Sequence, residues 1–376
     1  MKRKLLILLL HSLISLLAYN PGLSQQHPFF QGLQVGGGPF YGKLLKHRPS
    51  QMLFDLPHPV SGFSIEGARQ TSGKQFWHEV NGFPRPGWQV VHQNFGNKDI
   101  LGSSTGFQLF GDFFFLRQKS FSAFFRFGMG LCYVSRSFDS QTNPTNTAIG
   151  SHANNMSNLG FYAQYRITPA YLVRFGGGLM HVSNGKFWFP NLGLNTLNLN
   201  LGIYREISPP PKTEGFPYPE TWYKKPVVNI RVGLGGKEEK VAHGPKYPVY
   251  IVGIFISRMF SHKNKAFVGY EFFYDTAIGG FLTNQSLTKA DYLPSFRQNV
   301  FIGHEFMFGQ VALMTQIFYY IDRPATGSSK LGNKLGPKFY LLKPQDHPRF
   351  NAFGGIYLKT HGAVADYPEL SFGVSF

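Results

Sequence analysis

The sequence predicts an all-β protein: a single closed antiparallel transmembrane β-barrel of about 14–16 strands after a cleaved signal peptide. Three observations support this fold class. Aromatic residues make up 16% of the chain and 43 of its 376 residues are Gly, with a modest mean hydropathy of −0.16. Many segments of roughly ten residues alternate between apolar and polar, with turn residues between them. Beyond the N-terminus, no apolar stretch is long enough to cross a bilayer as a helix.

The N-terminus has the features of a secretory signal peptide. A basic start at residues 1–4 is followed by an apolar run over 5–17 and by small residues up to Ser24. We expect cleavage after Ser24, which divides the chain into a signal peptide at 1–24 and a barrel at 25–376. An uncleaved membrane anchor is the alternative, although the apolar run is short for a membrane helix.

The C-terminus sets the expected orientation. Residues 370–376 alternate and end in an aromatic residue, which resembles the last strand of bacterial outer-membrane proteins. Counting strands back from a periplasmic C-terminus places the loops 136–157, 185–194 and 279–294 outside the cell. These loops are long, as external loops of such barrels are. A secreted β-sandwich is the soluble alternative.

A Pro-rich segment at 208–226 interrupts the series of strands. It opens with Ser208-Pro209-Pro210-Pro211, and Pro cannot donate a hydrogen bond within a central strand. We interpret this segment as a long connection within one barrel, with a linker between domains as the alternative.

Composition also limits the partners and cofactors. Cys132 is the only cysteine, so no disulfide framework is expected. The formal net charge is +18 and the sequence pI is about 9.8. Because secretion argues against nucleic acid, the expected anionic partner is the phosphate groups of outer-leaflet glycolipid; generic surface basicity is the alternative. The histidines are scattered and no Cys ligand set exists, so neither a metal nor another cofactor is expected.

The stretch 171–205 contains the most informative pattern. Two runs alternate with period 2, as expected of two adjoining antiparallel strands. His181 and Ser183 lie on one face of the first strand, and Asn195 opens the second strand on its apolar face. All three polar residues therefore lie at the loop ends of strands and on the face expected to contact lipid.

These residue types can hydrolyse an ester. A His near a Ser hydroxyl can take its proton and make the oxygen a nucleophile, and a third polar group commonly orients the His ring. Asn195 is the candidate for that third group. Asn184 and Asn191 are candidates to stabilise an oxyanion. By spacing alone, an ordinary belt of polar residues at the membrane interface is the more common explanation of His181 and Ser183.

His181-Val182-Ser183-Asn184-Gly185, followed by Pro190-Asn191-Leu192-Gly193-Leu194-Asn195, resembles the signature of the outer-membrane lipid A 3-O-deacylases, also called acyloxyacyl hydrolases. The resemblance implies a lipid-facing barrel hydrolase that uses a His, a Ser and a Glu. It assigns the base to His181, the nucleophile to Ser183 and the oxyanion-side asparagines to Asn184 and Asn191. Asn195 stands where the family has its acid. The chain is also longer than the small family barrels and resembles a longer, two-part branch.

We therefore expect an outer-membrane carboxylic ester hydrolase that removes an acyl chain from lipid A. The alternatives are a non-enzymatic barrel, such as a pore or binding protein, and an outer-membrane phospholipase. Glu369 could supply the missing acid, but its strand alternation predicts a luminal side chain, as it does for His361 and Glu66.

Overall fold

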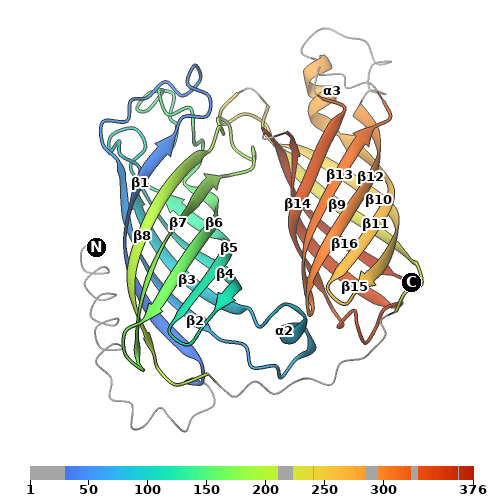
Figure 1. Cartoon of the computed structure of the whole chain (residues 1–376). Helices are drawn as coiled ribbons and strands as arrows, with labels where there is room; N and C mark the ends of the chain where they lie inside the picture. The colour runs from blue at the N-terminus through green and yellow to red at the C-terminus, as the bar shows by residue number, and fades with distance from the viewer. Residues whose placement is uncertain (1–29, 211–222, 240, 284–294, 323–328, 363) are drawn as a thin grey trace. The chain divides into compact units, whose positions relative to one another are not determined.

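The computed structural model describes residues 30–210, 223–239, 241–283, 295–322, 329–362 and 364–376. Its strands form two closed antiparallel barrels of eight strands each (Figure 1). The predicted signal peptide at 1–24 lies outside the described residues.

The first barrel closes where its last strand pairs with its first, through registers such as Leu45 with Asn195. Its strands are β1 (Leu33–Leu45), β2 (Val60–Arg69), β3 (Arg85–Asn94), β4 (Ser103–Arg117), β5 (Phe121–Val134), β6 (Ala153–Arg166), β7 (Tyr171–Ser183) and β8 (Leu194–Glu206).

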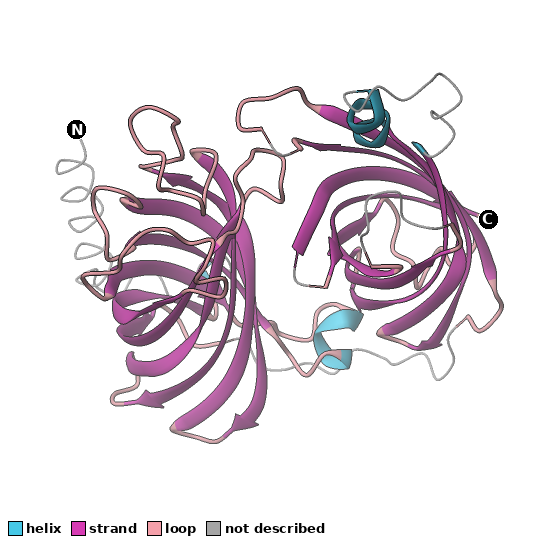
Figure 2. Cartoon of the chain, turned by 90° about the horizontal axis from the view of Figure 1, so that it is seen from above, coloured by secondary structure: helices cyan, strands magenta, loops and turns pink. Residues whose placement is uncertain are grey.

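The second barrel closes in the same way, with Phe372 of its last strand opposite Val232 of its first. Its strands are β9 (Val227–Lys237), β10 (Tyr247–Ser261), β11 (Asn264–Asp275), β12 (Phe296–Phe308), β13 (Val311–Tyr320), β14 (Leu331–Tyr340), β15 (Asn351–His361) and β16 (Val364–Ser375). Figure 2 shows this ring of strands from above.

The prediction of one barrel over 25–376 is therefore wrong. Alternation along a strand reports that its two faces meet different surroundings, but it does not say which strand closes the sheet. Pairing of β8 with β1 closes the first sheet before the Pro-rich segment begins. The segment 208–226 thus lies between the last strand of one barrel and the first strand of the other, and residues 211–222 of it lie outside the described residues.

Side chains alternate between the outside and the lumen along each strand. In β7, Phe175 and Leu179 on one face are 58% and 37% exposed. Met180 and Val182 on the other face are 6% and 0% exposed. The outward faces of both barrels carry many exposed Leu, Ile, Val and aromatic side chains, as a band that contacts lipid requires.

One end of the first barrel carries its longer loops, and we call it the loop end. The connections at the loop end are 46–59, 95–102, 135–152 and 184–193. The turns 118–120 and 167–170 lie at the opposite end, together with the connection 70–84 that contains the short helix α2 (Phe76–Val80). Buried apolar side chains fill the lumen near the loop end, including Phe40, Met156 and Val182 from strands and Met52, Phe54 and Phe95 from loops.

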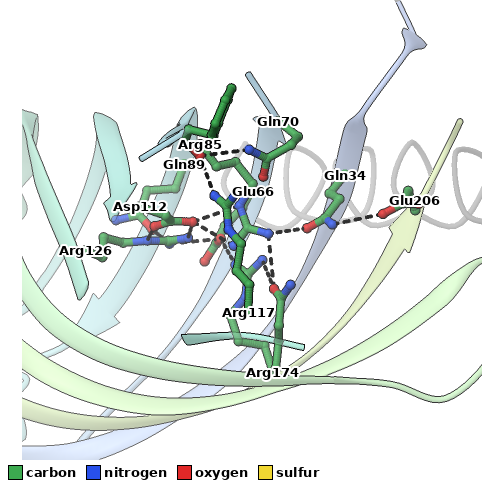
Figure 3. A network of polar contacts seen from close by, with 12 residues as sticks. Gln34, Glu66, Gln70, Arg85, Gln89, Asp112, Arg117, Arg126, Arg174 and Glu206 are labelled. Atoms are coloured by element: carbon green, nitrogen blue, oxygen red, sulfur yellow. Dashed lines mark hydrogen bonds and ion pairs between the residues drawn. The ribbon is translucent and has the colours of Figure 1, made fainter. Parts of the chain in front are cut away.

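A charged network fills another part of the first lumen (Figure 3). Asp112 accepts hydrogen bonds from Arg85 and Arg126, and Glu66 forms ion pairs with Arg126 and Arg174 at 2.9 and 2.8 Å. These five side chains are 5% exposed or less. The predicted luminal placement of Glu66 is therefore confirmed.

The second lumen is also filled by paired charges and aromatic rings. Lys334 forms ion pairs of 2.6 Å with both Glu271 and Glu369, while Lys338 pairs with Glu305 at 2.8 Å. Glu369 is 1% exposed, so the structure confirms that it points into the lumen. Eight-stranded barrels have interiors just wide enough for side chains, and here both interiors are occupied by them. In the part of the chain that the structure describes, packed side chains occupy the space that a pore would need open.

The described part of the chain has one further helix, α3 (Thr276–Thr283), after β11. None of the described helices is long and apolar enough to cross a membrane.

The luminal ion pairs predict a large effect on stability. Lys334→Met would leave Glu271 and Glu369 buried without their shared cation, so we expect the free energy of unfolding to fall by about 3–5 kcal/mol. The measurement is urea unfolding in detergent micelles, followed by heat-modifiable gel migration. Exposed Lys330 is the control, and Lys330→Met should change stability by less than about 0.5 kcal/mol. Equal losses in both variants would contradict this assignment.

Candidate active site

Neighbouring strands bring His181 and Asn195 together on the outward face of the first barrel. β7 and β8 are neighbours in the first barrel (Figure 1). They pair antiparallel, with His181 directly opposite Asn195. Both residues belong to the outward alternation, since their sequence neighbours Val182 and Leu194 are fully or almost fully buried. The structure therefore places this pair where the strand pattern predicts it.

A short hydrogen bond joins the two side chains. His181 Nδ1 lies 2.7 Å from Asn195 Oδ1. Because an amide oxygen only accepts hydrogen bonds, the imidazole donates through Nδ1–H. The neutral ring then has its lone pair on Nε2, which is the atom a general base needs.

Ser183 lies on the same outward face, two residues further along β7, and is the last residue of that strand. Residues at this spacing have Cα atoms about 7 Å apart and side chains that project in the same direction. Ser183 is only 6% exposed, and Asn155 of β6 lies directly opposite it in the register. A hydroxyl and an imidazole thus project side by side from the end of one strand.

The two predicted oxyanion residues lie in the connection 184–193. Asn184 follows Ser183 directly, and its Nδ2 donates to Ser151 Oγ at 2.9 Å. Asn191 is half-buried and lies three positions before Leu194, the first residue of β8. The oxyanion role of both amides stays a prediction.

Gly193 makes room for the His181 ring. Its φ is +79°, a left-handed conformation that favours glycine. A Cβ at this position would lie 2.9 Å from Cε1 of His181 and 3.3 Å from the carbonyl oxygen of Val182. The residue just before β8 therefore limits where the imidazole can lie.

Sequence reasoning missed three outward residues near this pair. His47, in the loop after β1, lies 3.1 Å through Nδ1 from Nδ2 of Asn195. Ser157 lies opposite His181 in the register and Asn155 opposite Ser183. The prediction that all of 136–157 is a loop is wrong at its end, because β6 begins at Ala153. Polar residues can extend a strand beyond the apolar band that contacts lipid. No local signal links His47 to Asn195, because β1 meets β8 only on barrel closure.

No carboxylate forms an ion pair with His181 among the described residues, and the ring's neighbour is the Asn195 amide. Glu66 and Glu369 are luminal, and Glu369 belongs to the second barrel. Within the described ranges, no group of three or more His, Cys, Asp or Glu side chains could hold a metal ion. The outward arrangement therefore offers a hydroxyl, an imidazole and an amide for chemistry at a lipid-facing surface.

The fold defines a class: β-barrels with an apolar outward band, of the kind that cross the bacterial outer membrane. Comparison with known families is more specific. Residues 67–204 match the model described as lipid A 3-O-deacylase (PagL), and residues 227–376 match the model described as acyloxyacyl hydrolase, C-terminal domain. The chain belongs to the lipid A 3-O-deacylase family of outer-membrane carboxylic ester hydrolases, with an additional C-terminal domain.

Solved structures are only distantly similar. The crystal structure of the outer membrane enzyme PagL shares 16% identity at a TM-score of 0.30, over 45% of this chain and 97% of its own. OccAB4 of Acinetobacter baumannii shares 8% identity at a TM-score of 0.24, over 93% and 99%. CdiB of the same organism shares 10% identity at 0.19, over 92% and 60%. No curated protein matches the chain. At these TM-scores, the similarities add nothing about fold or function to what the strand pairings and the family models show.

Gly193 provides a test of the site geometry. Gly193→Ala should lower ester hydrolysis by about 10²-fold, because the new methyl group displaces the His181 ring and displacements near 1 Å can cost that much. The measurement is hydrolysis of a lipid ester by the refolded protein.

Gly82→Ala is the matched control. Gly82 also has a left-handed φ, +69°, but nothing lies within 4 Å of a Cβ placed there. Gly82→Ala should therefore introduce the same kind of backbone strain as Gly193→Ala but leave ester hydrolysis unchanged. Equal activity of the two variants would show that Gly193 does not limit the ring.

Proposed function

We propose that this chain removes an acyl chain from lipid A by hydrolysing a carboxylic ester, with Ser183 as nucleophile and His181 as general base. The observation that carries the proposal is the 2.7 Å contact between His181 Nδ1 and Asn195 Oδ1, on the same outward face as Ser183. That contact leaves His181 Nε2 as a proton acceptor beside a hydroxyl. The family models supply the substrate class, since the matched family is named for lipid A.

The location fits a lipid substrate better than a soluble one. The three side chains project outward at the loop end, where an acyl ester near a lipid headgroup would lie. Lys43 of β1 is exposed on the same outward face. It lies opposite Leu197, one outward pair further from the loop end than Leu45 and Asn195. A lysine there can extend toward the interface and attract a headgroup phosphate.

The reaction follows the two-step chemistry of serine hydrolases. Ser183 Oγ attacks the ester carbonyl while its proton passes to His181 Nε2. The tetrahedral oxyanion would be stabilised by amide N–H groups, for which Asn184 and Asn191 are the candidates. As the intermediate collapses, the sugar oxygen leaves with the proton from His181. Water then attacks the acyl-Ser183 ester, again deprotonated by His181, and the fatty acid is released.

Ser183→Ala should abolish this activity, with a loss of at least about 10³-fold, because alanine has no oxygen to attack the ester carbonyl. The measurement is mass spectrometry of lipid A from cells that make the wild type or the variant. We expect loss of one acyl mass with the wild type only.

Ser103→Ala is the control for that experiment. Ser103 begins β4 at the same loop end, and its Oγ bonds to Ser135. It should leave deacylation unchanged. Identical lipid A from the wild type and Ser183→Ala, with both proteins inserted, would refute the proposal. Serine-dependent loss of acyl chains from phospholipids, with lipid A intact, would instead support the phospholipase alternative.

Position 195 gives a second test. Asn195→Ala should lower kcat by about 10²-fold, since the His181 ring loses its orienting acceptor. Asn195→Glu should keep or raise kcat, because a carboxylate both orients the ring and stabilises the imidazolium that forms. The same stabilisation should move the acid limb of the pH profile of kcat/KM to higher pH. A silent Asn195→Ala would show that another group orients His181.

A further inference from the structure

We propose that His47 is a positioning residue that sets the direction of the Asn195 amide and thereby the tautomer of His181. This inference rests on the proposed function. It concerns a residue outside the sequence signature, in the loop after β1, a strand that reaches the site only through barrel closure.

The geometry forms a chain of three side chains. His47 Nδ1 lies 3.1 Å from Asn195 Nδ2, and Asn195 Oδ1 lies 2.7 Å from His181 Nδ1. β1, β8 and β7 are neighbours here, with Leu45 opposite Asn195 and Asn195 opposite His181. The backbone N–H of His47 bonds to the carbonyl oxygen of Leu45, which holds the loop residue near the end of β1.

An amide needs such a partner, whereas a carboxylate does not. Both oxygens of a carboxylate accept hydrogen bonds, so a Glu beside His181 would select the Nδ1–H tautomer in either orientation. An Asn has one acceptor and one donor. If its amide turned by 180°, Nδ2 would donate to His181 Nδ1 and the ring proton would move to Nε2. His181 could then no longer take the proton of Ser183.

His47 selects the productive orientation. Neutral His47 with its proton on Nε2 offers an unprotonated Nδ1, which accepts from Asn195 Nδ2. The amide oxygen is then left for His181. The adjacent cations of the same loop have other contacts: Lys46 lies over the Phe54 ring at 5.3 Å, and Arg48 Nη1 lies 3.4 Å from Gln51 Oε1. Among the residues that the structure describes, His47 is the side chain that contacts Nδ2 of Asn195.

The test compares three substitutions at position 47 by their hydrogen-bonding capacity. His47→Ala removes the acceptor and should lower kcat roughly 3- to 10-fold with little change in KM, as expected for one exposed hydrogen bond. His47→Asn, whose side-chain oxygen can accept, should restore most of kcat. His47→Lys can only donate, so it should favour the turned amide and lower kcat further than His47→Ala.

His58→Ala is the matched control, because His58 is an exposed histidine of the same loop and its backbone N–H bonds to Gly96. It should leave kcat unchanged. In an Asn195→Glu background, His47→Ala should also have no effect on kcat, since a carboxylate needs no orienting partner. Nitrogen NMR shifts of His181 in micelles provide a readout besides activity: the wild type should show the Nδ1–H tautomer and His47→Lys the Nε2–H tautomer.

The outcomes separate this inference from the proposed function. If hydrolysis depends on Ser183 but His47→Ala matches the wild type, the inference is overturned and the function stands. Equal losses in His47→Ala and His58→Ala, or a loss that persists with Asn195→Glu, would show a structural loop effect and also overturn it. If no variant hydrolyses ester, the proposed function fails, and the His181 tautomer still decides whether His47 orients the amide.

Discussion

The narrow lumen of an eight-stranded barrel is the constraint on which the rest of this structure depends. Inward side chains must fill it, and any charge among them must be paired because little water is left to solvate it. The first barrel meets this requirement with Glu66 and Asp112 among arginines, and the second with Lys334 between two glutamates. Most of the ion pairs among the described residues are therefore structural, although acids and bases in a cavity often indicate catalysis.

Filling both lumens leaves the outer surface for chemistry. The His181–Asn195 pair lies on the outward face at the loop end, where an apolar band gives way to polar residues. An enzyme arranged in this way meets its substrate as a neighbouring lipid. An amide in place of an acid also suits this surface, since it adds no charge beside the membrane; the cost is that its direction must be set by a third residue.

The sequence predicted the candidate site better than the fold. Alternation over 171–205 placed His181, Ser183 and Asn195 on the outward faces of two strands, because the period-2 spacing of a strand fixes which of its side chains share a face. It also placed Glu66 and Glu369 in the lumen. It could not predict two barrels, since sixteen alternating strands satisfy one closed sheet or two equally well. The prediction of a loop over 136–157 missed the start of β6, because its outward residues Asn155 and Ser157 are polar.

The sequence by itself determined which faces of the strands meet lipid and which residues could hydrolyse an ester, because both follow from period-2 spacing and residue chemistry. Only the tertiary structure decided where each sheet closes, and closure pairs β1 with β8 across more than half the length of the first barrel's sequence. That pairing brings His47 to Asn195. Contacts between strands distant in sequence depend on register around the whole barrel, which no local pattern encodes.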